Sequence, residues 1–501
     1  MTEKPLHKFW AGIALMAILN LIVFDFIILR VPDVLQVKYT PDDTYYYLSL
    51  ARNFVRFHNW TFDSGVSLTT GFHLLWAYVL VLVYGIFQPT TDSFVRISLI
   101  LSSVLTLTSA LILFWKGWKY QQPFILASLT VFVCTRNVLI NSVSGVEWPL
   151  VTLIIVLFCV TFIEKYSIRS GKILLFVLGL LGSTARADFG LLAFFIFLSS
   201  FIVWKWRKNN EYLLPSVAGL IGAIVGVGIV FLHNYLFTGQ ALQSSALMKS
   251  HWMKGEINFY PLFLGSVGLL FLLLIPIFAG SLIKKMQVND LQYLLGLTAF
   301  FAWIGYGVFY SKNSDIQPWY SVNVLFSVFI FFCALWYSIQ HGRFVKYQFM
   351  PHVLFIVIFA VTFSRMFIKT YPVNEQNSEW IHQQPFLEAG KYLHDHPMTD
   401  GRVGAWNSGI VNYYQGGGVV NLDGLVNNDI YAYAIKDSSF DYLQRENIRY
   451  VIDFDVMFKD YVLKRSGYDD PRFTESLTPI KSFGKYPVTG NLTLYEIRNI
   501  K

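Results

Sequence analysis

The chain has 501 residues, of which 54% are hydrophobic, 18% are aromatic and only 14% are charged. Because soluble domains carry roughly 25% charged residues, this composition excludes an ordinary soluble protein and predicts a polytopic membrane protein. The formal net charge of +8 comes largely from short loops, where basic residues set membrane orientation, so it predicts no nucleic-acid partner.

Apolar runs divide most of the chain into predicted membrane spans, each needing about 20 residues. The spans are predicted at residues 9–29, 94–115, 122–140, 148–164, 172–186, 187–204, 212–235, 261–283, 291–310, 319–339 and 349–369. The first run is long and lacks a small-residue cleavage site, so we expect a signal anchor rather than a cleaved signal peptide.

One further apolar run, residues 73–87, is short and decides the topology. If it stays on the outer side, the basic loops between the spans all face the cytoplasm, as the positive-inside rule requires. If it spans, every later basic loop lies outside. We therefore predict a short interfacial or re-entrant helix on the outer side, within a first outer loop at residues 30–93.

The sequence predicts an α-helical polytopic membrane domain at residues 1–369, with about eleven spanning helices, followed by a different kind of segment. Residues 370–501 alternate polar helix-like stretches (376–394, 440–446) with strand-like runs (403–406, 419–422, 450–454, 492–497). This pattern is typical of a small α/β domain, and the helix count places it on the outer side of the membrane.

Two adjacent carboxylates, Asp42 and Asp43, follow the first span and precede three tyrosines that include Tyr46. Ionisable groups at a membrane edge are costly, so such a pair is a functional-site hypothesis. The alternative is structural, with Asp42 capping a helix and the tyrosines forming an aromatic belt. Capping explains one carboxylate but not two.

Two more polar residues are predicted on the same outer side. His73, at the entrance of the short helix, could meet a phosphate or a sugar, or could simply cap that helix. Glu147 opens the helix after residues 141–147, where its charge also suits the helix dipole. Glu147 could converge with Asp42 and Asp43.

Basic residues on the outer side are candidates for binding phosphate through charge-assisted hydrogen bonds. Arg186 is the first candidate and Lys249 the second, although Arg186 could instead pair with Asp188. Trp319 and Tyr320 are weaker candidates for the same cavity.

The order of these motifs resembles the GT-C superfamily of integral membrane glycosyltransferases that use polyprenyl-phosphate sugars. The similarity is greatest to the prokaryotic branch related to protein O-mannosyltransferases and lipid A aminoarabinose transferase. It rests on Asp42-Asp43 with Tyr45–Tyr47, Ala51-Arg52-Asn53, Thr70-Gly71-Phe72-His73, Ser144-Gly145-Val146-Glu147, Ala185-Arg186-Ala187-Asp188, Trp319-Tyr320, Trp406–Gly409 and Val420–Asn427.

The resemblance implies that Asp42 or Asp43 acts as base or binds the acceptor, and that Glu147 lines the same cavity. Asp42 is slightly favoured, because it matches the first acid of the family's pair. Some members of the superfamily need a divalent cation near these acids and others do not, so a cation stays open as a cofactor. Thr70-Gly71, His73-Leu74 and the Asp-Asp pair depart from the pattern of relatives, which leaves the sugar and acceptor open.

The resulting hypothesis is an inverting transfer of a sugar from a polyprenyl-phosphate donor to a hydroxyl of a glycan, lipid or protein. The reaction is expected at the outer face of a prokaryotic inner membrane, among membrane lipids. The alternative is a transporter or lipid flippase, which would use the same kinds of residue. Transporters tend to show internal repeats, and this chain shows none.

Overall fold

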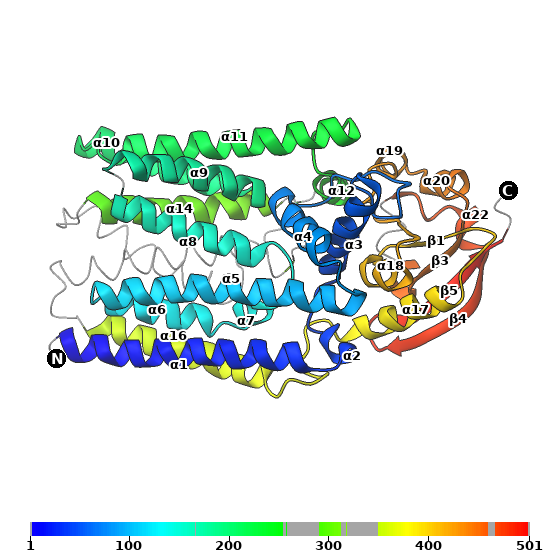
Figure 1. Ribbon diagram of the computed structural model, residues 1–501, viewed down its shortest axis with the longest axis horizontal. Helices are drawn as coiled ribbons and strands as arrows, with labels where there is room; N and C mark the ends of the chain where they lie inside the picture. Colours follow the sequence, from blue (N-terminus) through cyan, green and yellow to red (C-terminus); the bar gives the residue numbers. More distant parts are fainter. Residues whose placement is uncertain are drawn as a thin grey trace.

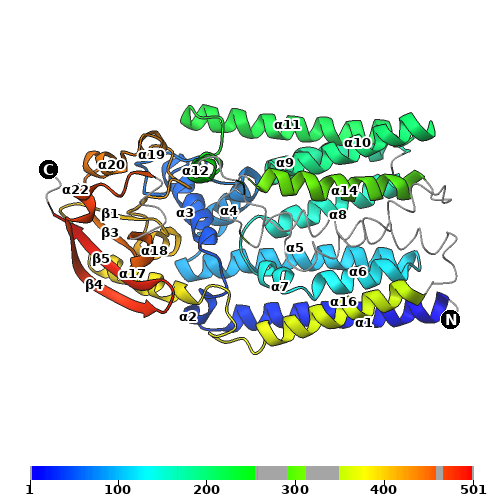
Figure 2. The same ribbon diagram turned by 180° about the vertical axis from the view of Figure 1, so that it is seen from behind.

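The computed structural model describes residues 3–165, 167–253, 257, 290–311, 317, 349–458 and 466–498. Long helices run side by side in a bundle, with the C-terminal domain at one end and the N-terminus at the other (Figures 1 and 2). The helices of the bundle are α1 (Glu3–Arg30), α5 (Thr91–Lys119), α6 (Pro123–Val133), α7 (Arg136–Ser142), α8 (Trp148–Lys165), α9 (Arg169–Ala185), α10 (Phe189–Arg207), α11 (Leu213–Thr238), α14 (Asp290–Tyr310) and α16 (Phe349–Thr370). We call the end that carries the C-terminal domain the domain end.

Within the described residues, five helices are long and apolar enough to cross a membrane, or six if α6 and α7 form one bent span. The protein is therefore an integral, multi-pass membrane protein. The span predicted at residues 122–140 is broken into α6 and α7, which meet at an angle of 70°. The predicted spans at 261–283 and 319–339 lie outside the described residues, so the number of spans stays a prediction.

The short apolar run forms helix α4 (Leu74–Phe87), which lies at the domain end and does not run the length of the bundle (Figure 1). Helices α2 (Asp33–Gln36), α3 (Asp42–Phe57) and α12 (Ser244–Met253) lie at the same end. The α5–α6 and α10–α11 connections, which carry several of the basic residues, lie at the opposite end (Figure 2). The short helix and these basic connections thus lie at opposite ends of the bundle.

Helices α9 and α11 pack unusually closely, because glycines replace larger side chains where they cross. A Cβ atom at Gly222 would lie 2.0 Å from the backbone oxygen of Phe176, and one at Gly179 would lie 2.2 Å from that of Gly219. Small residues at such contacts let helix backbones approach within a membrane, where packing rather than water exclusion drives association.

The C-terminal domain is built on a five-stranded sheet with the order β2-β1-β3-β5-β4. Its strands are β1 (Arg402–Ala405), β2 (Val419–Asn421), β3 (Ile448–Phe454), β4 (Leu477–Tyr486) and β5 (Gly490–Ile497). Strands β2, β1 and β3 are parallel, whereas β3, β5 and β4 pair antiparallel. The helical elements are η4 (Ile381–Gln383), α17 (Gln384–Asp395), α18 (Gly409–Gln415), α19 (Tyr431–Ala434), α20 (Ser439–Arg445) and α22 (Pro471–Thr474).

The fold agrees with the predicted small α/β domain, and the four predicted strand runs correspond to β1, β2, β3 and β5. The sequence reading missed β4, which is an edge strand with mostly exposed side chains and no apolar alternation. Parallel strands end at the same sheet edge, and the segments after β1 and β2 leave the sheet there and reach the membrane helices.

Candidate active site

A pocket lies where the domain end of the bundle meets the C-terminal domain. It is lined by Asp43, Tyr46, Tyr47, Leu50, Gly71, Phe72, His73, Glu147, Gln243, Ser245, Lys249, Leu425 and Val426. The walls thus come from α3, from the loop before α4, from the loop that ends at Glu147, from α12 with the residue before it, and from the loop after β2.

Helix α3 carries the acid pair, and its periodicity separates the two carboxylates. Asp43, Tyr47 and Leu50 line the pocket at helical spacing. Asp42 points elsewhere: its carboxylate accepts hydrogen bonds from the backbone N–H groups of Gly409, at 3.0 Å, and Ile410, at 2.7 Å. The two carboxylates therefore lie in different environments, and of the two only Asp43 faces the pocket.

Glu147 is 2% exposed and its carboxylate receives three contacts. Tyr47 donates its hydroxyl hydrogen to Oε2 at 3.0 Å, and Arg186 Nη1 donates to Oε1 at 2.9 Å. His73 Nε2 lies 3.5 Å from the same Oε1. Since a guanidinium neutralises it and its oxygens are occupied, Glu147 orients its neighbours rather than offering a free carboxylate.

The loop that carries Glu147 is fixed by side chains from three helices. The indole of Trp76 in α4 donates to the backbone oxygen of Gly145 at 2.9 Å, and the backbone N–H of Gly145 donates to Ser102 of α5 at 3.1 Å. Thr44 of α3 donates its hydroxyl hydrogen to the backbone oxygen of Ser144. Trp76 is buried, so it supports this loop instead of anchoring the chain at a membrane interface.

Arg186 is 3% exposed and lies behind Glu147, outside the lining of the pocket. Its Nε donates to both carboxylate oxygens of Asp188, at 3.0 and 3.1 Å, and its Nη2 donates to Tyr310 at 3.1 Å. Together with the bond to Glu147, the guanidinium is shared between two buried carboxylates. The structure thus supports the ion pair with Asp188 that the sequence left as the alternative.

His73 stands at the start of α4 with its ring between two polar partners. Nδ1 lies 3.5 Å from the side-chain nitrogen of Gln243, which also donates to the backbone oxygen of Phe72 at 2.6 Å. Nε2 faces Glu147. Burial lowers the pKa of His73, although the nearby Glu147 carboxylate opposes that shift. His73 is therefore neutral near pH 7.

Helix α12 brings a cation to the pocket. Lys249 is 6% exposed and lines the cavity together with Ser245, one helical turn earlier. The start of α12 is held by Thr70, whose hydroxyl accepts from the backbone N–H of Ser244 at 2.9 Å. Lys249 is the basic side chain that the described part of the chain contributes to the pocket lining.

The loop after β2 closes the pocket from the side of the C-terminal domain. A Cβ atom at Gly71 would lie 1.7 Å from the backbone oxygen of Leu425, so the two segments touch through a position that only glycine permits. Ser244 donates its hydroxyl hydrogen to that same oxygen at 2.9 Å. The backbone N–H of Thr70 donates to Asn428 Oδ1 at 2.9 Å.

Asp423 shapes this closing loop and is an acid that the sequence reading did not assign to the site. Its Oδ1 accepts from the backbone N–H of Leu425 at 2.8 Å, and the side chain is 7% exposed. Burial raises the pKa of Asp423 to about 8, and the neighbouring Asp42 and Asp43 carboxylates raise it too. At neutral pH Asp423 is therefore mostly protonated.

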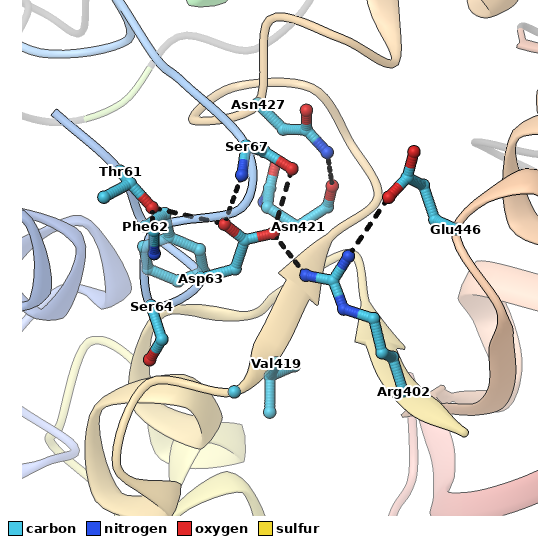
Figure 3. Close-up of polar contacts among 12 residues, drawn as sticks. Thr61, Phe62, Asp63, Ser64, Ser67, Arg402, Val419, Asn421, Asn427 and Glu446 are labelled. Atoms are coloured by element: carbon cyan, nitrogen blue, oxygen red, sulfur yellow. Dashed lines mark hydrogen bonds and ion pairs between the residues drawn. The ribbon is translucent and has the colours of Figure 1, made fainter. Parts of the chain in front are cut away.

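A second tie between the C-terminal domain and the first loop is an ion-pair cluster around the buried Asp63, which we call the Asp63 cluster (Asp63 with the half-buried Arg402 and Glu446; Figure 3). Arg402 Nη2 donates to Asp63 at 2.6 Å and Nη1 to Glu446 at 3.3 Å. Ser67 donates to Asp63 through its backbone N–H at 2.7 Å and its hydroxyl at 2.9 Å. The cluster does not line the pocket.

The structure thus brings Asp43, Tyr46, His73, Glu147 and Lys249 together in one pocket. Asp42 and Arg186 lie next to it with structural partners, and Trp319 and Tyr320 lie outside the described residues. The sequence reading did not assign Tyr47, Gln243, Ser245, Leu425 and Val426 to the site. The four-residue spacing of Asp43 and Tyr47 could have placed Tyr47 on the same helix face as Asp43. No local sequence pattern predicts the contact of residues 423–426 with residues 43–73.

The described residues do not assemble a site that holds a divalent cation through protein side chains alone. No three His, Cys, Asp or Glu side chains within the described ranges are placed to hold one ion. Both oxygens of Glu147 are occupied by Tyr47 and Arg186. We therefore assign no step of the chemistry to a metal.

Residues 373–495 match a family described as a domain of unknown function (DUF8728). No curated protein matches the sequence. Among solved structures, the chain is similar to ArnT from Cupriavidus metallidurans bound to undecaprenyl phosphate, with a TM-score of 0.57, 11% identity, and coverage of 98% of this chain and 99% of ArnT.

The chain is also similar to the archaeal oligosaccharyltransferase AglB from Archaeoglobus fulgidus in complex with an inhibitory peptide and a dolichol-phosphate. The TM-score is 0.55 at 11% identity, and the match covers 98% of this chain and 74% of AglB. At such identities the likeness shows the fold alone. The chain has the GT-C-like fold that the order of its motifs predicts.

Proposed function

We propose that the protein transfers a sugar from a polyprenyl-phosphate donor to an acceptor hydroxyl, within the pocket at the domain end of the bundle. The observation that carries the proposal is the presence of Asp43 and Lys249 in one pocket beside apolar membrane helices. A carboxylate can accept a proton from a hydroxyl, and a buried ammonium can bind a phosphate. The two structural neighbours that hold undecaprenyl phosphate and dolichol-phosphate support a lipid-linked donor.

In the proposed reaction, Asp43 takes the proton of the acceptor hydroxyl while the oxygen attacks the anomeric carbon. The bond between that carbon and the phosphate oxygen breaks, and its electron pair stays on the phosphate. Lys249 stabilises the charge that develops there, as preorganised cations do in transfer reactions. One displacement inverts the configuration at the anomeric carbon. Asp43 replaces Asp42 as the favoured base, because Asp42 is bound to Gly409 and Ile410.

The other pocket residues arrange these two groups and the substrates. Glu147 holds Tyr47 and His73 in place, and Arg186 pairs with Glu147 in a buried setting. Tyr46 and His73 present aromatic and polar surface to the bound sugar or acceptor. The first outer loop and residues 370–501 then lie on the outer face of a prokaryotic inner membrane, with the pocket between them.

The experiment incubates purified protein in detergent with labelled undecaprenyl-phosphate and dolichyl-phosphate sugars and a membrane extract as the source of acceptor. Labelled product is expected from at least one donor with the wild type. The variant Lys249→Ala is expected to need about 10- to 100-fold more donor, the loss expected for one charge-assisted hydrogen bond. Lys391→Ala, a change in α17 outside the pocket lining, is the matched control. Intact donor moved across vesicles without product would instead support a flippase.

A further inference from the structure

The domain of unknown function is joined to the helix that carries the candidate base. Successive residues of a helix point roughly 100° apart, so Asp42 and Asp43 lie on different faces of α3. Asp43 faces the pocket, whereas Asp42 faces α18 of the C-terminal domain. One of the two adjacent acids, Asp43, thus faces the reacting groups, and the other, Asp42, binds the C-terminal domain.

The contact at Asp42 is a helix cap made across two domains. The backbone N–H groups of Gly409 and Ile410, at the start of α18, donate to its two carboxylate oxygens. The first N–H groups of a helix have no partner within the helix and favour a negative charge. A Cβ atom at Gly409 would lie 2.4 Å from the backbone oxygen of Asp42, so α3 and α18 touch backbone to backbone.

Further along, α3 is tied to the same part of the domain through Tyr46 and Arg52. The Tyr46 hydroxyl lies 3.4 Å from the backbone oxygen of Trp406, to which it donates, and accepts from the backbone N–H of Ser408 at 3.3 Å. Arg52 donates to the backbone oxygen of Tyr413 at 3.2 Å and lies 5.1 Å from the centre of the Tyr413 ring. These ties fix both the rotation and the height of α3 over more than two turns.

We propose that the domain at residues 373–495 acts as a platform that sets the position of Asp43, with Asp42 as the positioning residue that transmits its docking to the base. The proposal rests on the proposed function, in which Asp43 is the base. It assigns a role to the domain that the family description leaves open. The domain also supplies a wall of the same pocket through Leu425 and Val426, so the site is incomplete without it.

The test moves α3 relative to α18 without changing any charge or any side chain of the pocket. Gly409→Ala adds a single methyl group that cannot fit against the Asp42 backbone. We expect kcat for sugar transfer to fall about 100-fold, as misplacement by about 1 Å can cost, with the donor KM within twofold of wild type. Gly418→Ala is the matched control, since its added methyl group meets only the flexible Gln415 side chain, at 3.1 Å.

A second pair of variants leaves the backbone unchanged, and it carries the test alone if Gly409→Ala does not fold. Asp42→Ala removes both bonds to α18, whereas Asp42→Asn keeps an oxygen that can accept one of them. We expect Asp42→Asn to recover at least tenfold of the kcat that Asp42→Ala loses, with the same donor KM.

Arg402→Ala shows whether a loss of domain stability is enough to lower kcat. It breaks the Asp63 cluster, at another point of the same interface. The proposal predicts that Arg402→Ala lowers the melting temperature but keeps kcat within threefold of wild type. It is overturned if Gly409→Ala and Asp42→Ala match Gly418→Ala in kcat, or if kcat falls in proportion to melting temperature across all these variants. Full activity of Asp43→Asn would overturn the proposed function instead.

Discussion

Replacement of Arg186 tests whether this residue holds the site together or grips the donor. Its guanidinium donates hydrogen bonds to Glu147, Asp188 and Tyr310, all within 3.1 Å. Arg186→Ala would leave two buried carboxylates without their shared cation. Breaking a buried ion pair by removing one partner costs about 3–5 kcal/mol, so we expect a large loss of thermal stability.

The assay follows thermal unfolding in detergent through the intrinsic fluorescence of the tryptophans. Arg186→Lys is expected to recover only part of the lost stability, because one ammonium cannot reproduce the planar set of donors that reaches both carboxylates. Lys249→Ala is the matched control, since it also removes a buried cation but one that lines the pocket. We expect it to unfold near the wild-type temperature.

The result that would refute this reasoning is an Arg186→Ala protein with wild-type thermal stability and a selective loss of donor use. That outcome would restore Arg186 as the phosphate-binding residue. It would also mean that Glu147 and Asp188 do not depend on the guanidinium in the way their distances indicate.

Three further predictions address other parts of the site. Gly71→Ala should abolish folding or activity, because the added methyl group would lie 1.7 Å from the Leu425 oxygen, and normal expression with normal transfer would contradict this contact. Burial raises the pKa of Asp423 to about 8, so the folded state holds a proton that the unfolded state loses from about pH 4, and stability should fall as pH rises between these values. Asp423→Asn should therefore raise the melting temperature more at pH 8 than at pH 5, and an equal effect at both values would contradict the assignment. Glu147→Gln should lower kcat at least tenfold by releasing Tyr47 and His73, and unchanged transfer would show that neither group needs to be held.

Much of the membrane domain could be predicted because span length and apolar composition are local properties of the chain. The runs at 9–29 and 94–115 correspond to α1 and α5, although each helix extends beyond its apolar run into polar ends. The bend between α6 and α7 could not be predicted from an apolar count, since residues 122–140 stay largely apolar across the break after Val133. The edge strand β4 was also not predicted from its sequence. Its pairing with β5 stabilises it, and its sequence has no alternation of apolar and polar residues.

The sequence predicted which residues gather near the site, but not which of them face the pocket and which have structural partners. Asp42 and Asp43 are equivalent in the sequence, and only the docking of α18 distinguishes them. The sequence allowed Arg186 either to bind phosphate or to pair with Asp188. The burial of Glu147 and Asp188 around it favours the structural pairing. Leu425 joins the pocket through long-range contacts with Gly71, for which no local pattern exists.

The most direct test of the central claim is the rate of sugar transfer by Asp43→Asn in the donor assay described above. An amide keeps the size of the carboxylate but removes its basicity, so we expect the rate to fall about 10²–10⁴-fold, the span of general-base catalysis, with the melting temperature unchanged. Transfer by Asp43→Asn at the wild-type rate would contradict the account.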